Sequence, residues 1–191
     1  MRGLFLTGSP GVGKSTLFFA IVEQLRLRGC SVGGIYAPEV REGGRRVGFR
    51  IVDLLSGESG WLAKEGGGEP RIGRYAVVTE EAERVGANAI YRAMRESCVI
   101  AIDEIGPMEL AVAGLSRAIE RALASEKPVL AVIHRRLHET HPSLFEMARR
   151  RGRVIEVTLN NRGFLLSQSR RLSHELWPGG HEGREGPDLH T

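Results

Sequence analysis

A stretch of eight residues at positions 8–15, Gly-Ser-Pro-Gly-Val-Gly-Lys-Ser, constrains the fold of this chain more than any other segment. It matches the pattern G-x-x-x-x-G-K-[ST], which is typical of a loop that wraps around phosphate groups. An apolar stretch at 4–7 precedes the loop, and apolar residues recur at helical spacing after it, at Leu17, Ile21 and Leu25. A strand, a glycine-rich turn and a helix in this order predict an α/β domain with an anion site at the start of its first helix.

The residue types in this loop fit the chemistry of a nucleoside triphosphate. Its glycines allow the backbone to turn several N–H groups toward phosphate oxygens. Lys14 can reach the β- and γ-phosphates, and Ser15 can offer its hydroxyl to Mg²⁺. We expect Thr16 to support the α-phosphate. The predicted nucleotide-binding residues of the loop are Gly8, Ser9, Pro10, Gly11, Val12, Gly13, Lys14, Ser15 and Thr16.

The rest of the sequence alternates between apolar extended segments and amphipathic segments, as in a parallel sheet covered by helices on both faces. We predict strands at 2–7, 32–36, 98–103, 128–133 and 153–158. We predict helices at 14–28, 80–95, 108–124, 141–151 and 161–176. The runs at 98–103 and 128–133 are almost continuously apolar, which is typical of central strands.

Residues 36–79 interrupt this alternation. A glycine-containing turn at 42–45, followed by alternating apolar and polar positions, predicts a β-hairpin. We therefore expect a single domain over 1–177 with a β-rich insertion at 36–79. The remaining residues, 178–191, are rich in glycine, proline and charge, which predicts a disordered tail.

The pair Asp103-Glu104 ends the apolar run at 98–103 and predicts the second half of the site. An aspartate in this place is typical of a Walker B motif, where it holds Mg²⁺, usually through water. Because ligands bind beyond the carboxyl ends of parallel strands, we expect this pair to lie beside the phosphate loop. A neighbouring glutamate can orient and deprotonate a water that attacks the γ-phosphate, which favours hydrolysis; the alternative is a surface or helix-capping carboxylate. We predict Ser15 and Asp103 as metal ligands, and Lys14 and Glu104 as catalytic residues.

The spacing of the two motifs adds to this interpretation. More than 80 residues, with at least one predicted strand, separate Ser15 from Asp103. This separation in the sequence suits the branch of phosphate-loop proteins whose sheet has an inserted strand and whose site has a catalytic glutamate. The sequence contains no N-K-x-D motif for reading guanine, so the GTPase-like branch has no support.

Composition excludes several other classes of protein. The chain has 191 residues, a formal net charge of +4 and two cysteines, Cys30 and Cys98, which cannot build a disulfide framework. No apolar stretch approaches the ~20 residues that a membrane span needs. We therefore predict a cytoplasmic protein with no membrane partner. The densest basic cluster, at 149–153, gives little support for nucleic-acid binding, and nothing in the sequence identifies a protein partner.

Taken together, the phosphate loop, the run Glu39-Val40-Arg41 before Gly-Gly-Arg-Arg-Val-Gly-Phe, and the run Asp-Glu-Ile-Gly-Pro-Met-Glu-Leu at 103–110 resemble the THEP1-type nucleoside-triphosphatases. Asn161-Arg162 fits a further element of that family. The resemblance covers about residues 1–170. It implies a P-loop NTPase fold, related to that of nucleotide kinases, with a central mostly parallel sheet. It also implies slow hydrolysis of several nucleoside triphosphates to the diphosphate and phosphate, with broad base tolerance.

Further residues are candidates for the same site. Outside the loop, we predict nucleotide contacts by Asp103, Glu104, Ile105, Gly106, Arg41 and Arg162. An arginine can stabilise charge that develops on the γ-phosphate, although each arginine of this arginine-rich chain also fits a solvated surface position. His134 follows the run 128–133 and is a candidate sensor of the phosphate. With His138 and His141 it has helical spacing, but no fourth ligand completes a zinc set.

The sequence leaves two other functions open. A nucleotide or nucleoside kinase would need an acceptor pocket, which the insertion at 36–79 could cover. A nucleotide-gated module that binds RNA or protein has only the basic charge in its favour. Release of phosphate from ATP without an acceptor separates hydrolysis from the kinase, and turnover that depends on Glu104 separates it from the binding module.

Overall fold

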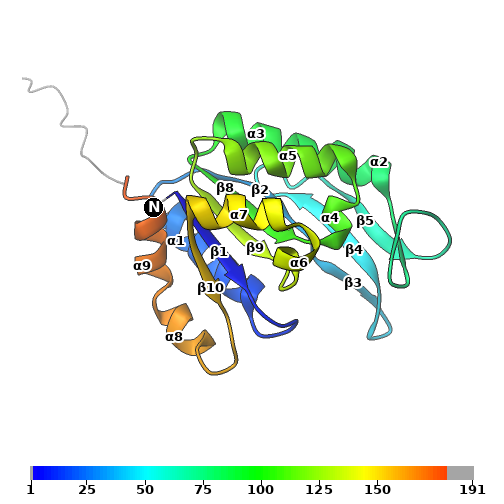
Figure 1. The fold of residues 1–191 in the computed structure, drawn as a ribbon, viewed down its shortest axis with the longest axis horizontal. Helices are drawn as coiled ribbons and strands as arrows, with labels where there is room; N and C mark the ends of the chain where they lie inside the picture. Colours follow the sequence, from blue (N-terminus) through cyan, green and yellow to red (C-terminus); the bar gives the residue numbers. More distant parts are fainter. Residues whose placement is uncertain (1, 180–191) are drawn as a thin grey trace, which may run out of the picture.

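The structure is a computed structural model that describes residues 2–179. In this part of the chain ten strands form one sheet, with helices on both of its faces (Figure 1). The strands are β1 (Gly3–Thr7), β2 (Val32–Tyr36), β3 (Glu39–Glu42), β4 (Arg45–Asp53), β5 (Ser59–Glu65), β6 (Arg71–Ile72), β7 (Tyr75–Val77), β8 (Val99–Ile105), β9 (Val129–Ile133) and β10 (Gly152–Glu156). The helices are α1 (Lys14–Leu27), α2 (Thr79–Ala82), the π-helical η1 (Glu83–Ala87), α3 (Asn88–Glu96), α4 (Pro107–Leu110), α5 (Ala113–Ala124), α6 (Leu137–Thr140), α7 (Pro142–Arg151), α8 (Arg162–Ser167) and α9 (Ser169–Leu176).

The sheet has a parallel half and an antiparallel half. The strand order is β10-β1-β9-β8-β2-β4-β5-β7-β6, with β3 paired to β4. The strands from β10 to β2 are parallel, and the pairings beyond β2 are antiparallel. The insertion therefore continues the sheet from the free edge of β2. The predicted α/β architecture with helices on both faces is confirmed.

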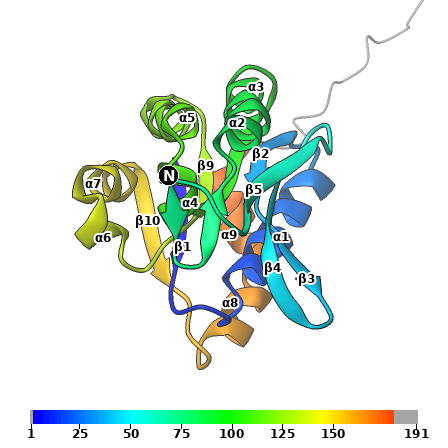
Figure 2. The same cartoon turned by 90° about the vertical axis from the view of Figure 1, so that its right-hand side faces the viewer.

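The two faces of the sheet bury separate apolar clusters. Phe5 of β1 points into the cluster that α3, α5 and α7 cover, whereas its neighbours Leu4 and Leu6 point into the cluster beneath α1 and α9. This alternation follows from the period of two in a strand. Figure 2 shows α3, α5 and α7 on one side of the sheet and α1 on the other. The central strands β8 and β9 are buried on both faces, as their continuous apolar runs predicted.

The order of the central strands agrees with the expected inserted strand. β9 lies between β1, which carries the phosphate loop, and β8, which carries Asp103. The strand that is inserted between them in the sheet is β9, which comes after both the phosphate loop and Asp103 in the sequence. The strands that separate these two motifs in the sequence lie elsewhere in the sheet. The loops after β1, β8 and β9 consequently meet at the carboxyl end of the parallel strands.

Several predicted elements differ in their bounds. The helix predicted at 80–95 contains the π-helical segment η1 between α2 and α3. The helix predicted at 108–124 is split at Val112, whose backbone is extended, and that predicted at 161–176 is split at Gln168. β8 continues two residues beyond Asp103. Most of the predicted tail, from residue 180 onward, lies outside the described residues. Within residues 2–179 no helix is long and apolar enough to cross a membrane.

Candidate active site at the phosphate loop

The loop after β1 has the backbone that its glycines predicted. Gly8, Gly11 and Gly13 have φ angles of 138°, 77° and 104°, which residues with a side chain rarely adopt. Gly8 is also packed so closely against the backbone oxygen of Val157 that a Cβ atom would collide with it. Gly13 is the N-cap of α1, and the first turn of this helix carries no acidic residue. The N-terminal end of α1 therefore presents unopposed positive potential at the loop.

Lys14 lies folded against this loop. Its Nζ donates hydrogen bonds of 2.9 Å to the backbone oxygens of both Gly8 and Ser9. An ammonium group has three donors, so this arrangement leaves one of them for another acceptor. The positive charge is thereby held at the centre of the loop, where phosphate oxygens would be bound.

Asp103 is brought beside the start of α1. It is 8% exposed and lies on β8, directly paired with Val132 of β9. Burial raises its pKa, whereas a hydrogen bond with the Ser15 side chain and the charge of Lys14 favour the ionised form. The structure thus joins Ser15 and Asp103, the two residues that were predicted to share a metal ion.

Glu104 belongs to the same group of side chains. It lies at an irregularity in the pairing of β8 with β9, where the Asp103–Glu104 peptide bond is cis. Burial raises the pKa of Glu104 to about 7, the charge of Lys14 opposes this rise, and the charge of Asp103 adds to it. A carboxyl group with a pKa near neutrality can accept a proton from water more readily than an ordinary glutamate can.

Glu109 is a further acidic residue of the site, and sequence reasoning gave it no role. It lies on α4 and is only 5% exposed. Burial and then the charge of Glu104 raise its pKa to about 8, while hydrogen bonds from the backbone N–H groups of Glu109 and Gly106 oppose this rise. The only local hint of this burial in the sequence is that Met108 and Leu110, the two neighbours of Glu109, are apolar. That hint is weak, because the same three residues could also lie on a partly exposed helix.

His134 directly follows β9, in the loop at the carboxyl end of this strand. Its backbone N–H donates a 3.0 Å hydrogen bond to the oxygen of Ile105. Burial lowers the pKa of His134, and the charges of Arg135 and Lys14 lower it further. Among the causes of this lowered pKa is the charge of Lys14, a residue of the phosphate loop.

Arg162 lies next to the phosphate loop. It begins α8, and its Cδ lies 3.8 Å from the position that a Cβ of Gly13 would occupy. The loop before it is fixed by Asn161, whose Oδ1 accepts the N–H of Thr158 and whose Nδ2 donates to the oxygen of Glu156, both at 2.8 Å. Asn161 therefore determines where Arg162 stands.

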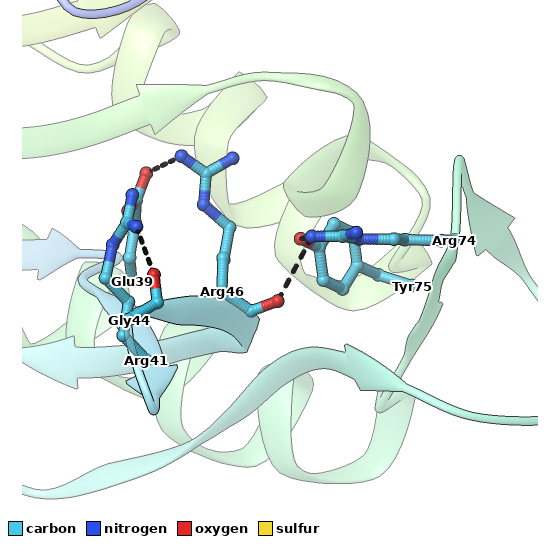
Figure 3. Close-up of polar contacts among 6 residues, drawn as sticks. All are labelled: Glu39, Arg41, Gly44, Arg46, Arg74 and Tyr75. Carbon is cyan, nitrogen blue, oxygen red and sulfur yellow. Dashed lines mark hydrogen bonds and ion pairs between the residues drawn. The ribbon is translucent and has the colours of Figure 1, made fainter.

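Arg41 is engaged within the β3–β4 hairpin (Figure 3). Its guanidinium donates hydrogen bonds of 2.8 and 3.0 Å to Glu39 and one of 2.9 Å to the oxygen of Gly44. Arg46 pairs with the other oxygen of the same carboxylate, and its own backbone oxygen accepts a hydrogen bond from Arg74. Among the described residues, none of the hydrogen bonds of Arg41 goes to the phosphate loop. The hairpin does lie at the same end of the molecule as the loop after β1 and α8 (Figure 2).

Comparisons with known proteins agree with this geometry. The family model for NTPase matches residues 3–169. A nucleoside-triphosphatase THEP1 from Thermofilum pendens is 47% identical over 171 residues, covering 89% of this chain and 94% of the relative. One from Methanopyrus kandleri is 43% identical over 177 residues, covering 92% and 96%.

Two solved structures share the fold over most of the chain. THEP1 from the hyperthermophile Aquifex aeolicus superimposes with a TM-score of 0.74 at 30% identity, covering 89% of this chain and 98% of that one. A human cancer-related nucleoside triphosphatase gives a TM-score of 0.73 at 34% identity, covering 92% and 98%. With the phosphate loop, the buried Asp103-Glu104 pair and these likenesses together, the chain belongs to the NTPase family, among the relatives of nucleoside-triphosphatase THEP1.

Proposed function

We propose that this protein hydrolyses nucleoside triphosphates to the nucleoside diphosphate and phosphate, with Glu104 as the group that orients and deprotonates the attacking water. The observation that carries the proposal is the buried Glu104 carboxyl group, with a pKa of about 7, next to Lys14 and Asp103. Relatives that are named nucleoside-triphosphatases support the reaction class.

The phosphate groups would be bound by the backbone N–H groups of residues 8–14 and by the N-terminal end of α1. Lys14 would turn its ammonium from the oxygens of Gly8 and Ser9 toward the β- and γ-phosphates. Thr16 would support the α-phosphate. Catalysis here would consist of positioning and of electrostatic stabilisation of the γ-phosphate.

The chemistry of Ser15 and Asp103 fits Mg²⁺. A hydroxyl and a buried carboxylate that already contact each other provide two hard oxygen donors at the start of α1, and a triphosphate would supply more. Bound there, Mg²⁺ would neutralise charge on the β- and γ-phosphate oxygens. We therefore propose Ser15 and Asp103 as its protein ligands.

The remaining contacts of the nucleotide are proposed from placement. Ile105 and Gly106 directly follow Glu104 in the chain, and Arg162 lies next to Gly13. Arg41 would contact the nucleotide only after its guanidinium leaves Glu39. None of these groups forms a pattern that reads one base, which supports broad base tolerance. With its two free cysteines, Cys30 and Cys98, the protein suits the cytoplasm.

The test is a panel of ATP, GTP, CTP and UTP with Mg²⁺, in which released phosphate is measured with and without nucleoside and nucleoside-monophosphate acceptors. We expect similar phosphate release from all four nucleotides with no acceptor present. If release is negligible until an acceptor is added, the protein is a kinase. If no nucleotide is turned over although it binds, the protein is a nucleotide-gated binding module.

A further inference from the structure

Gly106 lies between two carboxyl groups. A Cβ atom at this position would stand 3.0 Å from Oε1 of Glu104 and 3.2 Å from Oε2 of Glu109. Both distances are tighter than ordinary van der Waals contact to a Cβ atom. The backbone of Gly106 is extended, with φ of −143°, so conformational freedom is not the reason for a glycine here. The space is left free for the two carboxyl groups.

Glu109 fills one side of this space. It is the third residue of α4, three residues after the N-cap residue Gly106, and it is only 5% exposed. Interactions with the backbone of Glu109 and Gly106 oppose the rise of its pKa. Because its carboxyl group is buried against Gly106, it restricts the space that is open to Glu104.

Two neighbours act on Glu104. The charge of Lys14 favours its ionised form, and the buried carboxyl group of Glu109 lies against the same glycine, Gly106. A carboxylate that one neighbour attracts and another restricts sterically has a narrower range of orientations. Orientation matters for a general base, because it must stand within hydrogen-bond reach of the proton it removes.

We propose that Gly106 and Glu109 form a socket that fixes the carboxylate of Glu104 toward the phosphate loop. In this proposal both are positioning residues: Gly106 provides room for the carboxylate, and Glu109 closes the space behind it. The proposal rests on the proposed role of Glu104 in hydrolysis. It adds a positioning role to Gly106 and extends the site to Glu109, for which no contact with the nucleotide is proposed.

The first arm of the test uses Gly106→Ala and Glu109→Ala. We expect each to lower kcat, measured as single-turnover phosphate release with saturating MgATP, by roughly 10- to 100-fold, since a shift of about 1 Å in a catalytic group has such effects. Affinity for a fluorescent ATP analogue should change less than about threefold, because the phosphate loop is untouched. Glu109→Gln keeps the shape of Glu109 and still fills the space beside Gly106, so it should retain most of the wild-type kcat.

Matched controls separate the socket from general damage to the fold. Gly67→Ala adds a methyl group where nothing lies within 4 Å, and Glu81→Gln alters a carboxylate that accepts the N–H of Trp61. Both should leave kcat unchanged. Melting temperatures of all variants are measured under the same conditions.

The second arm combines each substitution with Glu104→Gln. If the socket acts through Glu104, then Gly106→Ala and Glu109→Ala cause no further loss in that background, since effects of residues that act as a unit are not additive. Equal fold-losses in both backgrounds overturn the proposal, as do single variants with wild-type kcat. If instead Glu104→Gln itself retains turnover, the assigned role of Glu104 is wrong, which is a different result from failure of the socket alone.

Discussion

Glu104 experiences opposing influences from its neighbours, and the balance sets its proton affinity. Burial and the charge of Asp103 disfavour its ionised form, whereas Lys14 favours it. The outcome is a pKa of about 7, which places the change between acid and base in the physiological range. A glutamate at its ordinary pKa would be ionised at that pH but would be a much weaker base.

This balance predicts how the rate depends on pH. Glu104 must be ionised to accept a proton from water, and its pKa is raised, so kcat/KM should increase with pH and level off above about 7. The measurement is phosphate release from MgATP between pH 5.5 and 9 at low substrate. A rate that falls as the pH rises through 7 would contradict a basic role for Glu104.

Replacement of the same side chain gives a second prediction. Glu104→Gln preserves the shape of the residue but removes its ability to take a proton, so turnover should fall by a factor on the order of 10² or more. Affinity for ATP, measured by titration calorimetry, should remain close to that of the wild type. The variant should also lose the rise of kcat/KM near pH 7, and a retained rise would assign that titration to another group.

At the scale of elements, hydrogen bonds fix the segment between β10 and α8 beside the phosphate loop. Val157 donates its N–H to the oxygen of Thr7 at 2.8 Å, and its own oxygen packs against Gly8. Asn161 then closes the segment through hydrogen bonds to Thr158 and Glu156. The start of α8 is thus tied to the strand that carries the loop.

Asn161→Ala should remove two of the hydrogen bonds that fix this segment. Loss of two hydrogen bonds, each worth about 1 kcal/mol, would release Arg162 from its place and raise KM for ATP by roughly 3- to 10-fold. We expect kcat to change less, because Lys14 and Glu104 are not moved. The exposed neighbour Asn160 provides the control, and an equal effect of Asn160→Ala on KM would show that the hydrogen bonds of Asn161 are unimportant.

The elements also show what the sequence could predict and what it could not. Residues 8–15 and Asp103-Glu104 were found from the sequence because their chemistry depends on residue type at short, fixed spacing. The strands β8 and β9 were found because both of their faces are buried, so they are apolar throughout. The burial of Glu109 depends on how α4 packs against β8, and no local pattern encodes that packing.

At the scale of the whole molecule, Asp53 fastens the inserted strands to the parallel half. Its side chain is 1% exposed and accepts a 2.7 Å hydrogen bond from Arg92 of α3. The same carboxylate accepts the N–H of Leu55 and the hydroxyl of Ser56, so it also shapes the turn after β4. One buried carboxylate therefore links the insertion to a helix that follows it in the chain.

Arg92→Ala should weaken this link. It leaves the buried charge of Asp53 without its cation, which should lower the free energy of unfolding by about 2 kcal/mol in urea denaturation. Arg95→Ala, which alters an exposed residue of the same helix, should cost much less. Equal losses for the two variants would mean that Asp53 is satisfied by its turn alone.

The sequence predicted the hairpin of the insertion but not its place in the sheet. Alternating residues in β4 revealed a strand with one apolar face, because that pattern is local. Its pairing with β2 joins Ile35 to Asp53 across the molecule, and such a contact depends on which edge of the parallel sheet is left free. Long-range pairing of this kind is a property of the assembled sheet rather than of any segment.

The position of β1 in the sheet has a consequence for folding during synthesis on the ribosome. β1 is made first, yet its partners among the strands of residues 2–179 are β9 and β10, which begin at Val129 and Gly152. At ordinary rates of synthesis, on the order of ten seconds pass before β9 emerges, and longer before β10 does. Until then Leu4, Phe5 and Leu6 have no strand partner to bury them. The phosphate loop at residues 8–15 is therefore synthesised long before the strands that hold β1 in the sheet. A nucleotide that binds this loop can stabilise the fold only near the end of translation.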